Sequence, residues 1–136
     1  MISFEINYGL LKGSQRITKE KVRRIFSRAG KTTGAPKKAF VSIAFVTKKE
    51  IAALNKRYRG KNGATDVLSF GADSCDGYLG EVVVCYQIAK SNSEKKHTSS
   101  AKEVEVLIAH GLLHLLGYDH RTKKEEKRMF EIQNSL

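Results

Sequence analysis

A stretch near the C-terminal end of the chain has the pattern of a long apolar helix that carries two histidines. Between Val104 and Leu116 the polar residues are one glutamate and the histidines at positions 110 and 114. A helix that is hydrophobic nearly all round is buried, so this one is expected in the interior of the fold. Positions i and i+4 lie about 40° apart around a helix, so His110 and His114 point the same way, as two ligands of one cation must.

A third histidine follows a predicted turn. Gly117 can adopt the left-handed conformation that ends a helix, and His120 comes three residues later, where it can fold back toward the first two. Three neutral imidazoles with a fourth position open are the ligand set of a catalytic zinc rather than a structural one, although ligand softness also admits nickel or copper. The alternative is two core-facing histidines and one on the surface. The spacing together with the turn glycine favours the metal site.

The residues around these histidines form a motif close to a known one: His110-Gly-Leu-Leu-His114-Leu-Leu-Gly117-Tyr118-Asp119-His120. Metzincin-type metalloproteases carry H-E-x-x-H-x-x-G-x-x-H, in which the glutamate is the general base. Here Gly111 takes its place, so a peptidase mechanism lacks its base and is only a minor alternative. The variant H-G-x-x-H-L-x-G-Y-D-H resembles the signature of the YbeY family, which comprises bacterial single-strand-specific endoribonucleases linked to ribosomal RNA maturation.

The resemblance extends from about Ala39 to Leu136. It includes Leu54-Asn55, Tyr58-Arg59-Gly60, Thr65-Asp66-Val67-Leu68-Ser69-Phe70, Gly80-Glu81-Val82-Val83 and Met129-Phe130 with Gln133. Three positions depart from the family pattern. Ala64 and Gly71 stand where proline is usual, which alters loop stiffness rather than chemistry. Glu81 replaces the usual aspartate, and we assign it no specific role.

The resemblance and the chemistry of the side chains suggest roles for two further residues. The functional arginine of the family occupies the Tyr-Arg-Gly position, which is Arg59 here, and a guanidinium matches a phosphate bidentately. The alternative for Arg59 is a helix-end residue that caps carbonyls or pairs with Asp66. Asp119, beside a predicted ligand, would either orient a histidine or cap the turn after Gly117.

The size and composition of the chain indicate one domain over residues 1–136. With 136 residues and 40% hydrophobic residues it can bury a single core, and no apolar run approaches the roughly 18 residues of a membrane span. The N-terminus shows neither a basic region nor a long apolar region, so we expect a cytoplasmic protein. Cys75 and Cys85 are expected to be reduced bystanders.

The positive charge of the chain is concentrated in one segment. The formal net charge is +11, and between Lys12 and Lys38 there are ten Lys or Arg residues and one acid, Glu20, which makes +9. Such a segment attracts phosphate backbones, although a solvated helix face is the alternative. Beside a candidate RNA-cleaving site, RNA or ribosome contact is favoured.

The apolar pattern predicts an α+β fold with a mixed sheet of about four strands packed against helices, and with the metal-carrying helix buried. The expected elements are strands at Ile2–Tyr8, Phe40–Val46, Thr65–Phe70 and Tyr78–Tyr86, and helices at Thr18–Gly30, from Thr47, at Gln87–Asn92, at Val104–Leu116 and from Lys123 to the end. The third and fourth strands should form an antiparallel hairpin. The YbeY resemblance implies a zincin-like arrangement of these elements.

Local signals set several of the expected boundaries. Thr47-Lys-Lys-Glu50 and Ser100-Ala-Lys-Glu103 are capping boxes, Gly30 is a helix stop, and the polar residues 93–100, which include His97, form a loop. The positions expected to face the core are Ile51, Leu54 and Tyr58 on one helix, and Met129, Phe130, Ile132 and Leu136 on the last.

Taken together, these features predict a zinc-dependent endoribonuclease that acts on single-stranded RNA. The resemblance implies ribosomal RNA as the substrate, with roles in 16S rRNA 3′-end processing and ribosome quality control. Expected partners are the small ribosomal subunit and its assembly factors, with no membrane or DNA partner. The alternative is a ribosome-associated RNA-binding assembly factor whose metal is structural. Two nucleophiles remain open, an activated water and the 2′-OH of the RNA.

Overall fold

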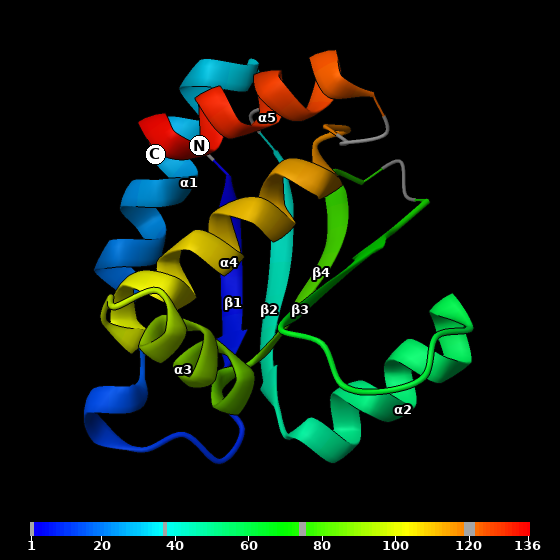
Figure 1. The fold of residues 1–136 in the computed structure, drawn as a ribbon. Helices are drawn as coiled ribbons and strands as arrows, with labels where there is room; N and C mark the ends of the chain where they lie inside the picture. The colour runs from blue at the N-terminus through cyan, green and yellow to red at the C-terminus, as the bar shows by residue number, and fades with distance from the viewer. Residues whose placement is uncertain (1, 37, 74–75, 119–121) are drawn as a thin grey trace.

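The computed structural model describes the chain except residues 1, 37, 74–75 and 119–121, and shows a four-stranded sheet flanked by helices (Figure 1). The strands are β1 (Ser3–Asn7), β2 (Phe40–Val46), β3 (Val67–Gly71) and β4 (Tyr78–Cys85), in the spatial order β1-β2-β4-β3. β1, β2 and β4 are parallel, and β3 pairs antiparallel with β4 at the edge. The predicted mixed sheet and its hairpin are confirmed.

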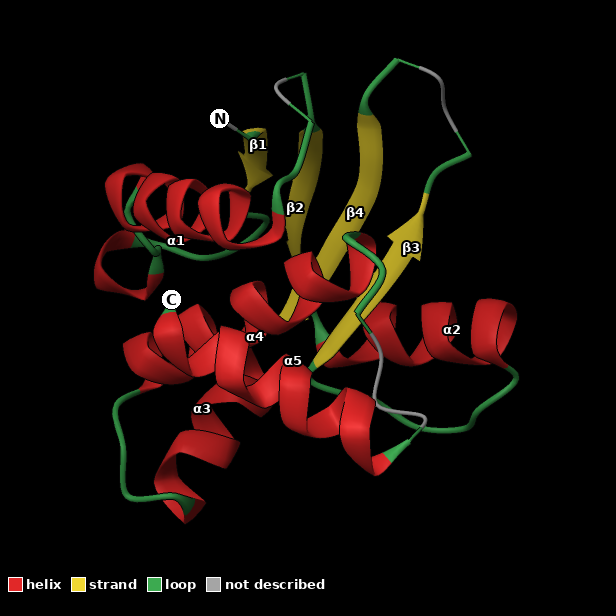
Figure 2. Cartoon of the chain, turned by 90° about the horizontal axis from the view of Figure 1, so that it is seen from above, coloured by secondary structure: helices red, strands yellow, loops and turns green. Residues whose placement is uncertain are grey.

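Five α-helices and one 3-10 turn connect and cover the strands. They are η1 (Gly13–Gln15), α1 (Lys19–Thr33), α2 (Lys48–Arg59), α3 (Tyr86–Lys95), α4 (Ser100–Leu115) and α5 (Lys123–Ser135). α1 and α4 cover one face of the sheet, and α2 lies on the other side near β3 (Figure 2). None of the helices in the described ranges is long and apolar enough to cross a membrane.

The alternation of side chains along β4 divides the core into two parts. Val82 and Val84 point into the main core with α1 and α4, whereas Val83 and Cys85 point into a smaller cluster with Ile51 of α2. Successive side chains of a strand point to opposite faces, so a strand covered on both faces is apolar throughout. The second half of β4 is apolar on both faces, which agrees with its position between β2 and β3 inside the sheet.

The helix α4 is the most buried helix, as its sequence predicted. Its fully buried residues are Glu103, Val104, Leu107, Ile108, Ala109, Gly111, Leu112 and Leu113. Gly117 ends it in the left-handed conformation with φ 98°. The N–H of Tyr118 donates to the Leu113 carbonyl, and that of Gly117 donates to the His114 carbonyl, both at 3.0 Å. This is a Schellman turn, and it confirms the predicted role of Gly117.

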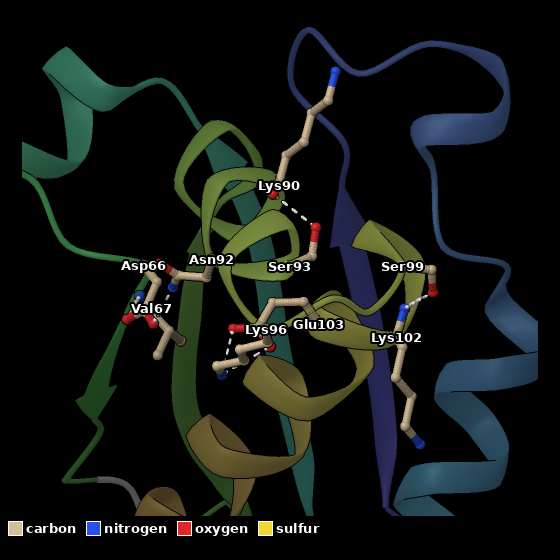
Figure 3. A network of polar contacts seen from close by, with 9 residues as sticks. All are labelled: Asp66, Val67, Lys90, Asn92, Ser93, Lys96, Ser99, Lys102 and Glu103. Atoms are coloured by element: carbon tan, nitrogen blue, oxygen red, sulfur yellow. Dashed lines mark hydrogen bonds and ion pairs between the residues drawn. The ribbon is translucent and has the colours of Figure 1, made fainter.

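Two predicted helix boundaries are wrong, namely the end of α1 at Gly30 and the capping box of α4 from Ser100 to Glu103. α1 continues through Gly30 and ends at Gly34, whose φ of 68° is left-handed. α4 is capped by Ser99, which accepts from the Lys102 N–H, and not by a box from Ser100 to Glu103 (Figure 3). Glu103 is instead 2% exposed and pairs with Lys96 Nζ at 3.1 Å.

Three smaller corrections concern residues expected in the core or in a loop. Tyr58 and Phe130 are 57% and 51% exposed. Tyr58 lies in the last turn of α2, where its ring packs edge-on against Phe70 at 5.4 Å rather than entering the core. The helix predicted at 87–92 extends to Lys95, which shortens the predicted loop, and His97 is an exposed residue of the following turn with φ 56°.

Candidate metal centre

A cleft of about 740 Å³ opens between the C-terminal half of α4, the edge strand β3, and the loop that follows α2. His110, His114, Arg59, Ser69 and Asp66 are among the residues that line it. The fold therefore brings the first two predicted metal ligands and the predicted phosphate-binding arginine to one cavity. The two histidines come from α4 and the arginine comes from α2, while β3 contributes a further wall of the cleft.

The two imidazoles of α4 converge on a common point. Their Nε2 atoms are 3.2 Å apart, and the ring centroids are 4.7 Å apart with the planes 79° to each other. Two nitrogen ligands of a tetrahedral zinc, each about 2.0–2.1 Å from the ion, lie about 3.4 Å from one another. His110 and His114 thus fit a shared zinc ion with little adjustment, and their assignment as ligands stays a prediction.

The orientation of His110 is set by a residue of α5. Nδ1 of His110 lies 3.1 Å from Oε1 of Gln133. An amide oxygen only accepts, so this contact favours the tautomer with the proton on Nδ1, in which the Nε2 lone pair is left for a cation. Metal-binding histidines commonly have such a partner on the second nitrogen. Gln133 belongs to the YbeY-like pattern of the C-terminal helix, but that pattern does not predict its contact with His110.

Packing between α5 and α4 brings Gln133 to the histidine. Met129 and Ile132 of α5 form a small buried cluster with Leu113 of α4. Gln133 follows Ile132 in the same helix and lies at the margin of that cluster. The apolar positions of the last helix therefore indicate that this helix docks on α4, but not which polar residue would contact His110.

The remaining predicted metal residues lie outside the described part of the chain. His120, the predicted third ligand, and Asp119, the predicted orienting or capping residue, both fall in the range 119–121. Among the described residues, no group of three His, Cys, Asp or Glu side chains is placed to hold a metal ion. The described part of the site is therefore a pair of imidazoles.

Gly111 lies where α4 comes closest to the sheet. A Cβ atom at this position would be 2.6 Å from Cγ1 and 3.1 Å from Cγ2 of Val82. The Gly111 carbonyl also accepts a hydrogen bond of 3.2 Å from Ser69 Oγ of β3. Glycine is thus required by close packing, which gives a physical reason why no glutamate follows the first histidine.

Arg59, the last residue of α2, is exposed and reaches the edge strand. Its Nη2 donates to the carbonyl oxygen of Ser69, and its guanidinium lies 5.9 Å from the centre of the Phe70 ring. The outer carbonyls of an edge strand have no partner strand, so they are free to accept such a bond. Neither alternative for Arg59, capping its own helix or pairing with Asp66, describes this contact.

The carboxylate of Asp66 accepts hydrogen bonds from β3 and α3 rather than from Arg59. Oδ1 accepts from the backbone N–H of Val67 at 2.8 Å, and Oδ2 accepts from Nδ2 of Asn92 at 3.1 Å (Figure 3). Asp66 therefore ties the start of β3 to α3. Because β3 forms one wall of the cleft, this tie helps to fix the position of Ser69 and, through it, of Arg59.

Comparison with known proteins gives the family. The sequence profile described as Endoribonuclease YbeY matches residues 7–136. The chain belongs to the YbeY family. A relative named Endoribonuclease YbeY from Macrococcus caseolyticus is 36% identical over 124 residues, which cover 85% of this chain and 80% of the relative. One of the same name from Staphylococcus epidermidis is 34% identical over 146 aligned positions, covering 99% and 92%.

A solved structure supports the YbeY fold. The solution structure of TM1509 from Thermotoga maritima is similar with a TM-score of 0.63 and 32% sequence identity, and the match covers 99% of this chain and 85% of that one. The family resemblance inferred from the histidine motif and the Tyr-Arg-Gly block is thereby confirmed.

Glu81, the position where this chain departs from the YbeY pattern, lies away from the histidines. It is on β4 beside Val82, and its side chain points to the face opposite Gly111, since neighbouring residues of a strand alternate. Burial raises the pKa of its carboxyl group, and the negative charge of Glu5 raises it further. The position of Glu81 agrees with giving it no role in the cleft.

Proposed function

We propose that this member of the YbeY family is a metal-dependent endoribonuclease that hydrolyses single-stranded RNA. The observation that carries the proposal is the convergence of two imidazole Nε2 atoms, 3.2 Å apart, in the cleft that also holds the exposed guanidinium of Arg59. Phosphodiester hydrolysis needs a group that activates the nucleophile and a cation for the charge that develops on the phosphate. The names of the relatives, Endoribonuclease YbeY, support the same reaction class.

In this proposal the metal ligands, the glutamine that orients one of them and the arginine have separate tasks. His110, His114 and His120 hold zinc, while nickel and copper remain compatible with imidazole ligands. When bound, zinc supplies a Lewis acid and lowers the pKa of water toward neutrality. The amide oxygen of Gln133 accepts a hydrogen bond from Nδ1–H of His110, which would orient the ring so that Nε2 faces the ion.

Arg59 binds the phosphate in this proposal. A guanidinium carries five N–H donors, so the bond to the Ser69 carbonyl leaves donors for two phosphate oxygens. The contact with β3 also limits the motion of a long exposed side chain. Arg59 is thereby held in the cleft before the substrate arrives, which reduces the entropy lost when the phosphate is bound.

The biological substrate that we propose is ribosomal RNA. The family resemblance supports a cytoplasmic role in 16S rRNA 3′-end maturation and in ribosome quality control, with the small ribosomal subunit and its assembly factors as partners. The positive charge of the chain is compatible with such partners, because proteins that bind nucleic acid neutralise phosphates with Lys and Arg.

The proposal is tested by cleavage of a labelled single-stranded RNA before and after metal removal. We expect the zinc-loaded protein to cleave it, the chelated protein to be inactive, and added zinc to restore cleavage, with a fully duplex RNA left intact. Circular dichroism of the chelated protein controls for unfolding. A zinc-bound, folded protein that leaves RNA uncut would instead support the assembly factor with a structural metal.

Arg59→Lys is expected to lower the turnover of single-stranded RNA by about 10²-fold while the metal content stays the same, because lysine keeps the charge but not the bidentate geometry. The measurement is kcat with zinc-saturated protein. Arg57→Lys is the matched control, since Arg57 lies in the same last turn of α2 and stacks on Tyr58 at 5.3 Å. Unchanged turnover in Arg59→Lys would remove the phosphate-binding role.

A further inference from the structure

The solvent side of α1 is strongly basic. Six exposed residues, which we call the α1 basic face, are Lys19, Lys21, Arg23, Arg24, Arg28 and Lys31. The opposite side of the helix is apolar and packs into the main core through Val22, Ile25, Phe26 and Ala29. Glu20 is the sole acidic residue of this helix. Six of the ten cations of the basic segment Lys12–Lys38 therefore lie on the exposed side of one helix.

The arrangement of these charges does not favour the helix itself. Lys19 and Lys21 lie in the first turn, where the helix dipole favours acidic side chains. Arg24 and Arg28 are four residues apart, and like charges at this spacing repel each other. Glu20 in the first turn, which is four residues before Arg24, and Lys31 in the last turn do favour the helix. The remaining positive charges repel one another, and an external polyanion would relieve this repulsion.

Little within the described part of the chain neutralises this surface. The one salt bridge among the described residues joins Lys96 and Glu103, which lie on α3 and α4. Arg28 Nη1 donates a hydrogen bond of 2.9 Å to the carbonyl oxygen of Leu136 at the end of α5. The other cations of the α1 basic face remain available to an outside partner.

The α1 basic face lies at the opposite edge of the sheet from the cleft. α1 packs on β1, where the rings of Phe26 and Phe4 are 5.2 Å apart, and the cleft adjoins β3. β1 and β3 are the two outer strands, separated by three strand spacings or about 14 Å. Both views show α1 and α2 on opposite sides of the sheet (Figures 1 and 2). An RNA that contacts both sites must therefore extend beyond the cleft and across the sheet.

We propose that the α1 basic face is a second RNA-binding surface, which holds the phosphate backbone of a long, structured RNA while a single-stranded part enters the cleft. Lys21, Arg24, Arg28 and Lys31 follow one stripe at helical spacing. The stripe is about 15 Å long, a length over which a nucleic-acid duplex presents several phosphates. This inference rests on the proposed function for the cleft and adds a separate contact that serves affinity rather than chemistry.

The test separates binding of long RNA from cleavage of short RNA. In the double variant Lys21→Glu, Arg24→Glu, both changes are at exposed positions. We expect its affinity for a structured RNA, measured on chelated protein, to fall at least about tenfold, and the salt dependence of binding to weaken by about two units of slope. Cleavage of a short single-stranded oligonucleotide by the zinc-loaded variant should equal that of the parent.

The matched control is Lys90→Glu, Lys95→Glu, which changes the net charge equally at two exposed positions of α3. An equal loss of affinity in the control, or no loss in the α1 variant, would overturn the proposal. Preferential binding of the parent to anionic lipid vesicles over RNA would overturn it too. If the parent binds structured RNA through α1 but cleaves no RNA, the cleft function fails while the second surface stands.

Discussion

His114→Ala is expected to abolish cleavage of single-stranded RNA by zinc-treated protein. The variant removes one of two imidazoles whose Nε2 atoms are 3.2 Å apart, so the remaining ligands cannot complete the predicted three-histidine set. The side chain is half-buried at the cleft and is not part of the hydrophobic core, so the fold should survive. The measurements are RNA cleavage, bound zinc per chain and the circular dichroism spectrum, on protein prepared identically to the parent.

The matched control for this variant is His97→Asn. His97 is exposed in the turn between α3 and α4, and asparagine tolerates its left-handed φ of 56° better than alanine does. We expect zinc content and cleavage like those of the parent. If His114→Ala cleaves RNA as fast as the parent, the activity belongs to a contaminating nuclease or to another site, and the metal centre loses its proposed role.

Most of the elements were predictable because their signals are local. The strand Phe40–Val46 was predicted with the boundaries that the structure has, since a nearly continuous apolar run is bounded by a helix cap. The box from Thr47 to Glu50 forms as expected, with Glu50 Oε1 accepting from the Thr47 N–H at 3.1 Å. The burial of α4 followed from its apolar surface on all sides. Each of these features depends on residues that are close to one another in the sequence.

The errors arose where a local signal competes with tertiary structure. Gly30 was expected to end α1, but in the structure it lies inside the helix, where a Cβ atom would make an ordinary van der Waals contact with Ile2 at 3.7 Å. Glu103 has the spacing of a capping residue, yet it turns inward and pairs with Lys96. The Glu103 side chain is 3% exposed, whereas that of Lys96, at the end of the preceding helix, is 59% exposed. An ion pair of this kind leaves no periodic trace in a sequence, so spacing alone cannot separate it from a cap.

In the candidate site, too, local sequence patterns predict the arrangement within one element but not the contacts between elements. The convergence of His110 and His114 follows from helical geometry, because they lie on one element. The contact from Gln133 joins residues 23 positions apart, and the bond from Arg59 to Ser69 joins α2 to β3. Such contacts depend on the order of strands and the docking of α5. These come from the packing of several apolar surfaces at once, and no motif of the sequence encodes them.

Gly111→Ala is expected to destabilise the protein although alanine is the better helix former. The new Cβ atom would lie 2.6 Å from Cγ1 of Val82, a fully buried side chain whose χ1 is restricted by β-branching. Overpacking of this kind costs about 1–3 kcal/mol against a gain of about 1 kcal/mol in helix propensity, which leaves a net loss of up to about 2 kcal/mol. The free energy of unfolding, measured with urea, should therefore fall.

Gly30→Ala is the matched control, because Gly30 is also inside a helix but has no atom closer than 3.7 Å to the new Cβ position. It should raise the free energy of unfolding by about 0.5–1 kcal/mol. Gly111→Glu, which restores the metalloprotease motif, should be less stable than Gly111→Ala, since it adds a carboxylate to the same tight contact.

We expect the Gly111→Glu variant to show no peptidase activity, measured as cleavage of denatured casein. Peptidase activity in a folded Gly111→Glu variant, lost on chelation, would show that packing against Val82 is not what excludes the base.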